Sequence, residues 1–183
     1  MNKRMLSLIP ICSALTAAGA FIKIPIAPVP ITLQNFFVIL TGIILGPKAG
    51  AMSQIIYIIV GLIGLPVFSG GGGLSYIFKP TFGYILGFIA ASAIAGYVMK
   101  QKKFNVLTVF TASALGMLAV YLIGVPYLAL YLYFIMHNAD AVGIAVKTGM
   151  LLFIPGDLVK CMVIAMIMPR LASLTGLTKK QSQ

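Results

Sequence analysis

The sequence has almost no acidic side chains: it contains two aspartates, Asp140 and Asp157, and no glutamate. It also has a single histidine and two cysteines, Cys12 and Cys161, whose spacing matches no metal-binding or redox motif. Acid–base catalysis and metal binding both need clusters of such groups. The composition therefore predicts no enzyme, no catalytic residues, no metal site and no cofactor.

Charge of either sign is scarce. Charged residues make up 8% of the chain and hydrophobic residues 61%, and the mean hydropathy is +1.09. A typical soluble domain has about 25% charged residues, so the sequence predicts an integral membrane protein. At roughly 20 apolar residues per transmembrane helix, the length accommodates about six helices and leaves no room for a soluble catalytic domain.

The net charge of +11 does not indicate a nucleic-acid partner. The lysines and arginines lie between apolar runs rather than along one face of a predicted helix. We therefore expect the lipid bilayer, and no nucleic acid, to be the partner that explains the basic residues.

Prolines, glycines and lysines divide the apolar sequence into the helices of an all-α bundle. We expect one membrane domain, residues 1–183, with spans at about 5–24, 32–45, 49–65, 80–99, 104–124 and 147–169. The first span resembles a secretory signal, but the next apolar run follows without a soluble domain to export, so we interpret it as a span. After the fifth span, residues 127–136 predict a helical tail or an interfacial segment.

Six spans place both termini on one side of the membrane. The basic residues expected on that side are Lys3, Arg4, Lys48, Lys100, Lys102, Lys103, Arg170, Lys179 and Lys180, and those on the other side are Lys23, Lys79 and Lys147. Because cytoplasmic loops carry the excess of lysine and arginine, the sequence predicts cytoplasmic termini. The proline-rich connection after the first span and the glycine-rich loop before the fourth are then expected outside.

Asp157 and Lys160 lie one helical turn apart within an apolar stretch, residues 150–168. An ionisable side chain inside a membrane helix is costly without a partner, a water-filled cavity or a ligand. The two side chains share a helix face, where the carboxylate can accept from ligand N–H groups and the ammonium can donate to a ligand carbonyl. We expect them to bind a cyclic urea or amide. Alternatively, the pair neutralises itself, or Asp157 accepts from backbone amides freed at Pro155.

A candidate anion site lies before the fourth span. Lys79 precedes Pro80, where the N-terminal end of the helix dipole is positive, although an interfacial lysine that reaches for water would look the same. The preceding loop contains four consecutive glycines, Gly70, Gly71, Gly72 and Gly73. Their amides could bind a carboxylate, or the run could be only a hinge.

Two further residues are candidates for a pocket wall. Gln34 follows the proline-rich connection and could hydrogen-bond a ligand, or it could pair with neighbouring backbone. Tyr84 could pack against an apolar ring, although tyrosines near membrane boundaries are ordinarily interfacial anchors. Neither residue predicts a site by itself.

Five segments form an ordered pattern: PVPITLQN at 28–35, LGPKAG at 45–50, GLIGLPVFSGGGG at 61–73, PTFGYILGF at 80–88 and PGDLVK at 155–160. Together they resemble the BioY family, the biotin-specific substrate-capture (S) subunits of energy-coupling-factor vitamin transporters. The resemblance implies a six-helix bundle in the prokaryotic plasma membrane, with biotin bound near the outer surface. It also implies that Asp157 and Lys160 contact the ureido ring and that Gln34 lies beneath a lid.

The chain departs from the family at two places. Some members carry asparagine or serine in the glycine-rich loop and an arginine after the Gly-Tyr pair, whereas this chain has four glycines and Ile85 after Tyr84. The valerate carboxylate of biotin therefore needs another partner. Our hypothesis is that Lys79 or the amides of residues 70–73 bind it.

The resemblance also implies partner subunits. The chain has no nucleotide-binding motif, so uptake would require a transmembrane coupling subunit and paired ATPase subunits, with Ala14 and Ala18 as the docking face. The same four-residue spacing of small residues recurs at Gly42 and Gly46 and at Gly83 and Gly87. Packing within the bundle is the alternative explanation for such spacing.

Two other functions fit the same residues. Asp157 and Lys160 would suit another vitamin that contains a cyclic amide. They could also relay protons in a small ion-coupled carrier.

Overall fold

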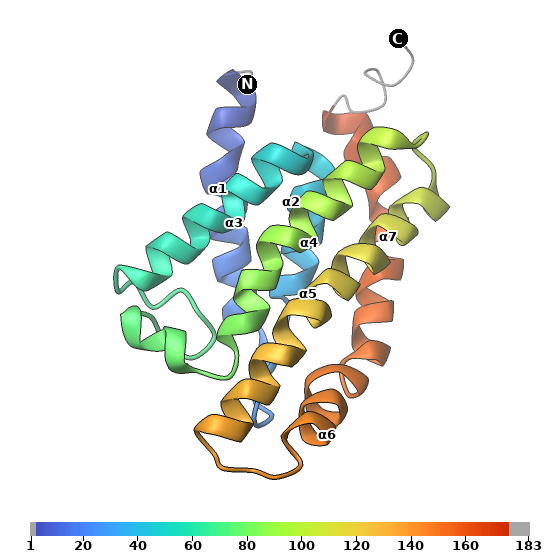
Figure 1. Ribbon diagram of the computed structural model, residues 1–183. Coiled ribbons are helices and arrows are strands. Elements are labelled where there is room, and N and C mark those ends of the chain that lie inside the picture. Colours follow the sequence, from blue (N-terminus) through green and yellow to red (C-terminus); the bar gives the residue numbers. More distant parts are fainter. Residues whose placement is uncertain (1–2, 176–183) are drawn as a thin grey trace.

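The computed structural model describes residues 3–175, with side chains from 6 to 171, and most of these residues are helical. The elements, shown in Figure 1, are α1 (Lys3–Phe21), β1 (Lys23–Ile24), β2 (Ile31–Thr32), α2 (Gln34–Leu45), α3 (Pro47–Leu62), η1 (Leu74–Phe78), α4 (Phe82–Gln101), α5 (Val106–Phe134), α6 (Ala141–Val146), η2 (Lys147–Leu151, a π-helix) and α7 (Ile154–Thr175).

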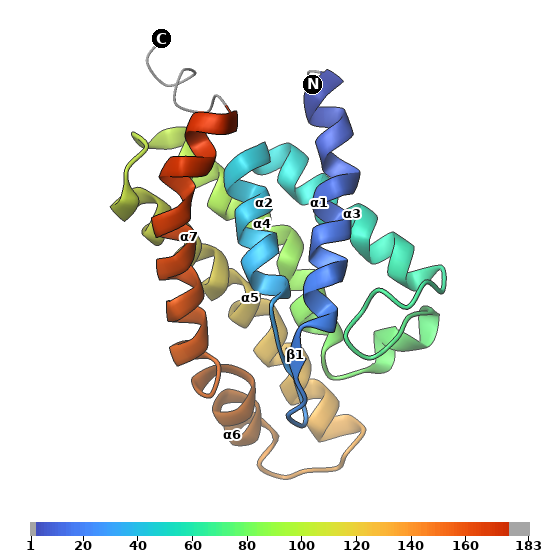
Figure 2. The ribbon, with the colours of Figure 1, turned by 180° about the vertical axis from the view of Figure 1, so that it is seen from behind.

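The short helix α2 lies inside the bundle, between α1 and α7 and in contact with α3, α4 and α5 (Figure 2). Its Val38 and Ile39 side chains are completely buried. Because α2 is surrounded by other helices, its apolar side chains pack against protein over its whole length. Its N-terminal end, at Gln34, begins directly after the small hairpin formed by β1 and β2.

Glycines allow the helices to approach one another closely. A Cβ atom on Gly42 of α2 would lie 2.1 Å from the backbone oxygen of Ser92 in α4, and one on Gly87 of α4 would lie 3.0 Å from Val120 in α5. These two glycines therefore serve packing within the bundle. Gly46 has a different role, because it ends α2 with a φ of +80°, a conformation that favours glycine.

Ala14 and Ala18 on α1 are exposed, unlike the glycines at the helix crossings. The opposite face of α1 packs on α3, where the Ser13 hydroxyl donates to the Ser53 carbonyl at 2.7 Å. Thr16 on the same inner face is completely buried. Ala14 and Ala18 thus face away from the bundle.

Three connections gather at the end of the molecule opposite the first turn of α1 and the last turn of α7 (Figure 1). The first is the lid hairpin, residues 23–32, in which Lys23 pairs with Thr32 and Ile24 with Ile31. The second is the glycine loop, residues 63–73, which leads into η1. The third joins α5 to α6. These connections cover the ends of α2, α4 and α5.

The helices overlap the ranges expected for spans. Of the two alternatives for residues 127–136, the helical tail is observed, because α5 runs through Pro126 to Phe134. The last helical region begins earlier than expected, with α6 and η2, and the chain turns before α7 starts at Ile154. Pro155 explains this start, because proline fits the first turn of a helix but disrupts a helix interior.

Within the described part of the chain, three helical segments are long and apolar enough to cross a membrane: Phe82–Gln101, Val106–Phe134 and Ala141–Leu171. Three shorter apolar helices accompany them, at Leu6–Phe21, Gln34–Leu45 and Pro47–Leu62. The largely helical architecture predicted from the sequence is therefore confirmed, and it includes helices that are long and apolar enough to cross a membrane.

Gly42→Ala tests the close contact between α2 and α4. The added methyl group would meet backbone rather than a movable side chain, so we expect a loss of about 1–3 kcal/mol. For a chain of this size, each kcal/mol lowers the melting temperature by roughly 2–4 °C. Thermal unfolding in detergent measures the change.

Gly156→Ala is the matched control, because a Cβ atom there meets nothing within 4 Å. Its melting temperature should stay constant or rise slightly, since alanine has the higher helix propensity. Equal melting temperatures for both variants would contradict the proposed packing.

Candidate functional site

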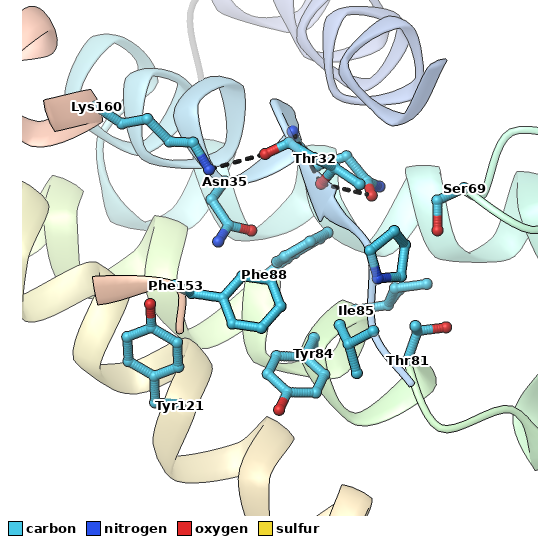
Figure 3. A pocket seen from close by; sticks show the side chains of 13 residues that line it. Thr32, Asn35, Ser69, Thr81, Tyr84, Ile85, Phe88, Tyr121, Phe153 and Lys160 are labelled. Carbon is cyan, nitrogen blue, oxygen red and sulfur yellow. Dashed lines mark hydrogen bonds between the residues drawn. The ribbon is translucent and has the colours of Figure 1, made fainter. Parts of the chain in front are cut away.

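A pocket lies beneath the lid hairpin, between the glycine loop and helices α2, α4, α5 and α7 (Figure 3). It is lined by Val29, Pro30, Thr32, Gln34, Asn35, Ser69, Thr81, Tyr84, Ile85, Phe88, Tyr121, Phe153 and Lys160. The cavity volume is about 40 Å³, much smaller than the roughly 300–1,000 Å³ of typical ligand pockets. A ligand of vitamin size would therefore have to displace the covering loops.

One end of the pocket contains the buried ion pair. Lys160 Nζ lies 2.8 Å from Asp157 Oδ1 and donates a second hydrogen bond, also of 2.8 Å, to the carbonyl of Thr32. Lys160 itself lines the pocket, whereas Asp157 is 4% exposed and contacts residues that line it. The lysine ammonium thus links α7 to the lid hairpin.

The second oxygen of Asp157 is also hydrogen-bonded. The Tyr121 hydroxyl donates to Oδ2, and the Asn35 amide lies 3.5 Å from the same atom. Three donors from α2, α5 and α7 therefore surround one carboxylate.

The middle of the pocket is apolar. The side chains of Phe88, Phe153 and Tyr84 lie between the Lys160 end and the Ser69 end (Figure 3). The Tyr84 hydroxyl points away to the Gly149 carbonyl, to which it donates at 2.9 Å. Tyr84 thus contributes its ring to the pocket wall, and its hydroxyl joins α4 to η2.

The other end of the pocket is polar again. Ser69 and Thr81 lie there, and both hydroxyls are within hydrogen-bonding distance of the Tyr76 hydroxyl, at 3.4 and 3.0 Å. Tyr76 is almost completely buried. The pocket thus has a charged end at Lys160 and a polar end at Ser69, and aromatic side chains, together with Thr32 and Gln34, line the region between them.

Gln34 lines the pocket, but its amide is held by neighbouring residues. Its Nε2 donates to the Tyr57 hydroxyl at 2.6 Å, and its Oε1 accepts from Thr32 at 3.2 Å. Tyr57 in turn donates to the carbonyl of Val67 in the glycine loop. Gln34 thus connects the lid hairpin to α3 and the glycine loop.

Lys79 and the four consecutive glycines lie beside the pocket rather than in its wall. Lys79 Nζ donates to the Gly70 carbonyl at 2.9 Å. The amides of Gly71 and Gly73 donate to the carbonyls of Phe68 and Gly61. Both glycines have a φ above +90°, which favours glycine and explains part of the run.

Sequence reasoning missed Tyr121. Tyr121 received no role from the sequence, although its hydroxyl donates directly to Asp157 Oδ2. No signal in the sequence indicated this role, because Tyr121 lies three residues before the end of the predicted span 104–124, near a boundary where tyrosines usually anchor a helix.

The described residues include no group of three or more histidine, cysteine, aspartate or glutamate side chains that could hold a metal ion. The pocket offers a buried anion, a cation, neutral hydrogen-bonding groups and aromatic surface. This combination suits non-covalent binding of a molecule with a polar head and an apolar body.

Comparison with known proteins identifies relatives along nearly the whole chain. A family model described as the BioY family matches residues 1–176. A probable biotin transporter BioY from Pyrococcus horikoshii is 43% identical over 93% of this chain and 98% of its own length. The biotin transporter BioY from Thermotoga maritima is 36% identical, over 90% and 93%. A probable biotin transporter BioY from Lysinibacillus sphaericus is 47% identical over 67% of this chain and 63% of its own length.

Solved structures agree with these sequence matches. The S-component for biotin from an ECF-type ABC transporter superposes with a TM-score of 0.80, at 29% identity, covering 94% of this chain and 95% of that one. FolT bound with folic acid superposes with a TM-score of 0.63 at 18% identity, which indicates a shared fold. On the strength of the match over residues 1–176, the chain belongs to the BioY family.

Proposed function

We propose that this chain captures biotin as the S component of an energy-coupling-factor type ABC transporter. It is a transport protein and not an enzyme. The observation that carries the proposal is the ion pair of Asp157 and Lys160 at one end of the pocket, in a chain whose relatives are named biotin transporters.

The charged end of the pocket matches the chemistry of a ureido ring. Lys160 lines the pocket and can donate to the ureido carbonyl, and Asp157 can accept from a ureido N–H group. Asn35 lines the same end and offers an amide. The ligand would replace some of the contacts that now hold the pair, so neither charge would lose its compensation on binding.

The apolar middle suits the thioether ring and the aliphatic chain of biotin. Tyr84, Phe88 and Phe153 present aromatic surface to the pocket. A thioether sulfur, such as that of biotin, packs favourably against aromatic rings. Biotin would therefore lie along the pocket, with its ureido ring at Lys160 and its carboxylate toward Ser69. Gln34, which lines the pocket beneath the lid hairpin, would hydrogen-bond the ligand.

Binding would require movement of the loops, because the present cavity of about 40 Å³ is too small for the vitamin. The lid hairpin and the glycine loop are the covering segments. They contain little regular structure, and such segments open at low free-energy cost compared with packed helices. We propose that they part to admit biotin and close again over it.

We propose six membrane spans with cytoplasmic termini in the prokaryotic plasma membrane, within one domain of residues 1–183. Three helical segments and three shorter apolar helices supply the spans. The first turn of α1 and the last turn of α7 lie at the same end of the molecule (Figure 1). The excess of basic residues at that end supports the orientation.

ATP-driven uptake would require an energising module, which we propose to consist of a transmembrane coupling subunit and paired ATPase subunits. Ala14 and Ala18 are exposed on α1, and small exposed residues one turn apart allow another helix to approach closely in lipid. We propose this face of α1 as the docking face for the coupling subunit.

Asp157→Asn and Lys160→Met test the head-group site. Each change leaves the partner charge buried and uncompensated, which costs about 2–5 kcal/mol. Biotin affinity should therefore fall roughly 30-fold or more in each variant, as measured by calorimetric titration of the detergent-purified protein. Asp140→Asn, which alters the exposed aspartate of the α5–α6 connection, should bind normally. Near-wild-type affinity in both pocket variants would reject the site.

Tyr121→Phe tests the positioning of Asp157. The change removes the hydroxyl that donates to Oδ2 and keeps the ring, and a hydrogen bond to a charged group contributes about 1.5–3 kcal/mol. We expect biotin to bind roughly tenfold more weakly. Tyr133→Phe, at a tyrosine that is 59% exposed, is the control. If both tyrosine variants bound equally well, Tyr121 would have no part in recognition.

The double variant Ala14→Leu, Ala18→Leu tests the docking face. The larger side chains should keep another helix at a distance and abolish biotin uptake by cells that express the energising module. Biotin binding to the purified chain should not change, because α1 contributes no side chain to the pocket wall. Ala139→Leu, in the α5–α6 connection, should leave uptake intact. Normal uptake by the double variant would refute the docking role.

A further inference from the structure

The polar end of the pocket near Ser69 lies close to two lysines. Lys23 Nζ of the lid hairpin donates to the Ser69 carbonyl, and Lys79 Nζ donates to the carbonyl of Gly70, the next residue. Two cations from separate segments thus bind adjacent carbonyls of the glycine loop. Neutral carbonyls leave the positive charge of both ammonium groups uncompensated.

The chain has few carboxylates that could compensate these lysines. Of its two acidic residues, Asp157 is paired with Lys160 at the opposite end of the pocket. Asp140 lies in the α5–α6 connection, at the start of α6. The Ser69 end of the pocket is therefore positive, which favours an anionic group of the ligand.

Both lysines are exposed and neither lines the cavity itself, but the register of the hairpin brings Lys23 nearer to the lining residues. Lys23 and Thr32 are direct partners in the antiparallel ladder, so their side chains leave the ribbon on the same face. Thr32 lines the pocket, and so does Ser69, to which Lys23 is bound. Lys79 differs, because it is bound to Gly70 and lies 5.2 Å from the centroid of the Tyr76 ring.

The lid hairpin thereby reaches both ends of the pocket. Through the carbonyl of Thr32 it accepts a hydrogen bond from Lys160, and through the side chain of Lys23 it is fastened to Ser69. We infer that Lys23 is the residue that recognises the carboxylate of the ligand: its ammonium exchanges the Ser69 carbonyl for the carboxylate when the hairpin closes. This inference rests on the proposed function, because it takes biotin as the ligand.

The exchange is favourable for electrostatic reasons. An ammonium has three N–H donors, so Lys23 can bind the carboxylate without losing every other contact. A hydrogen bond between opposite charges is roughly twice as strong as one between neutral groups. The lysine would thus select ligands with an anionic tail, while Asp157 and Lys160 select the head.

The affinities for biotin and biotinamide distinguish two roles of Lys23, which are recognition of the ligand's charge and attachment of the lid hairpin to Ser69. Biotinamide has the same rings and chain but a neutral tail. At low salt, Lys23→Ala should weaken biotin binding about tenfold and change biotinamide binding less than about twofold. The loss should shrink at high salt, because exposed charges are screened.

Matched variants make the test sharper. Lys23→Gln retains a donor for the Ser69 carbonyl but lacks the charge, so it should behave like Lys23→Ala, and Lys23→Arg should restore biotin binding. Lys79→Ala should have the smaller effect on biotin. Lys147→Ala removes an exposed lysine that does not line the pocket and should have no effect.

The outcomes are distinguishable. Equal weakening of biotin and biotinamide by Lys23→Ala would show that the lysine only fastens the hairpin and would overturn the inference. A carboxylate-specific loss in Lys79→Ala but not in Lys23→Ala would overturn it as well. A wild-type chain that binds neither compound would instead refute the proposed function itself.

Discussion

Asp157 and Lys160 can keep their charges among apolar helices only because each compensates the other and both have further hydrogen-bonding partners. Removing two ions from water costs several kcal/mol per ion, and their attraction offsets this cost only with good geometry. Here the geometry depends on three other segments, because Tyr121, Asn35 and Thr32 supply the remaining contacts. The relative positions of α2, α5, α7 and the lid hairpin therefore determine whether the pair is stable.

The same requirement explains why α2 is buried at the centre. Asn35 can reach Asp157 only if α2 lies beside α7 and α5. Gly42 allows this by letting α2 lie against the backbone of α4 at Ser92. Close helix packing at one end of α2 thus positions the polar residues at its other end. The helix packing at Gly42 and the position of the binding residue Asn35 therefore depend on each other.

The covering loops are linked through Gln34 as well as through the two lysines. The contacts from Thr32 through Gln34 and Tyr57 to Val67 join the lid hairpin to the glycine loop. Opening either segment for a ligand would disturb this chain of hydrogen bonds. The two loops are therefore expected to move together, with α3 as the fixed element between them.

Some of the site could be predicted because charge is so rare in this chain. Asp157 and Lys160 were evident as an isolated pair at helical spacing, and the structure places them together. Tyr121 was not evident, because one tyrosine among many apolar residues of α5 gives no sign of what it faces. Small residues recur at four-residue spacing on α1, α2 and α4, and this spacing does not show which of them are buried. Gly42 and Gly87 pack inside the bundle, whereas Ala14 is exposed.

The sequence alone determined the membrane character, the mainly helical fold, the glycine loop and the presence of one buried charged pair, because each follows from local composition and spacing. Only the tertiary structure decided which distant residues surround that pair and that Lys23 reaches Ser69, 46 positions away. The physical reason is that helix periodicity fixes which residues share a face, whereas the partner of that face depends on how helices distant in the sequence pack together.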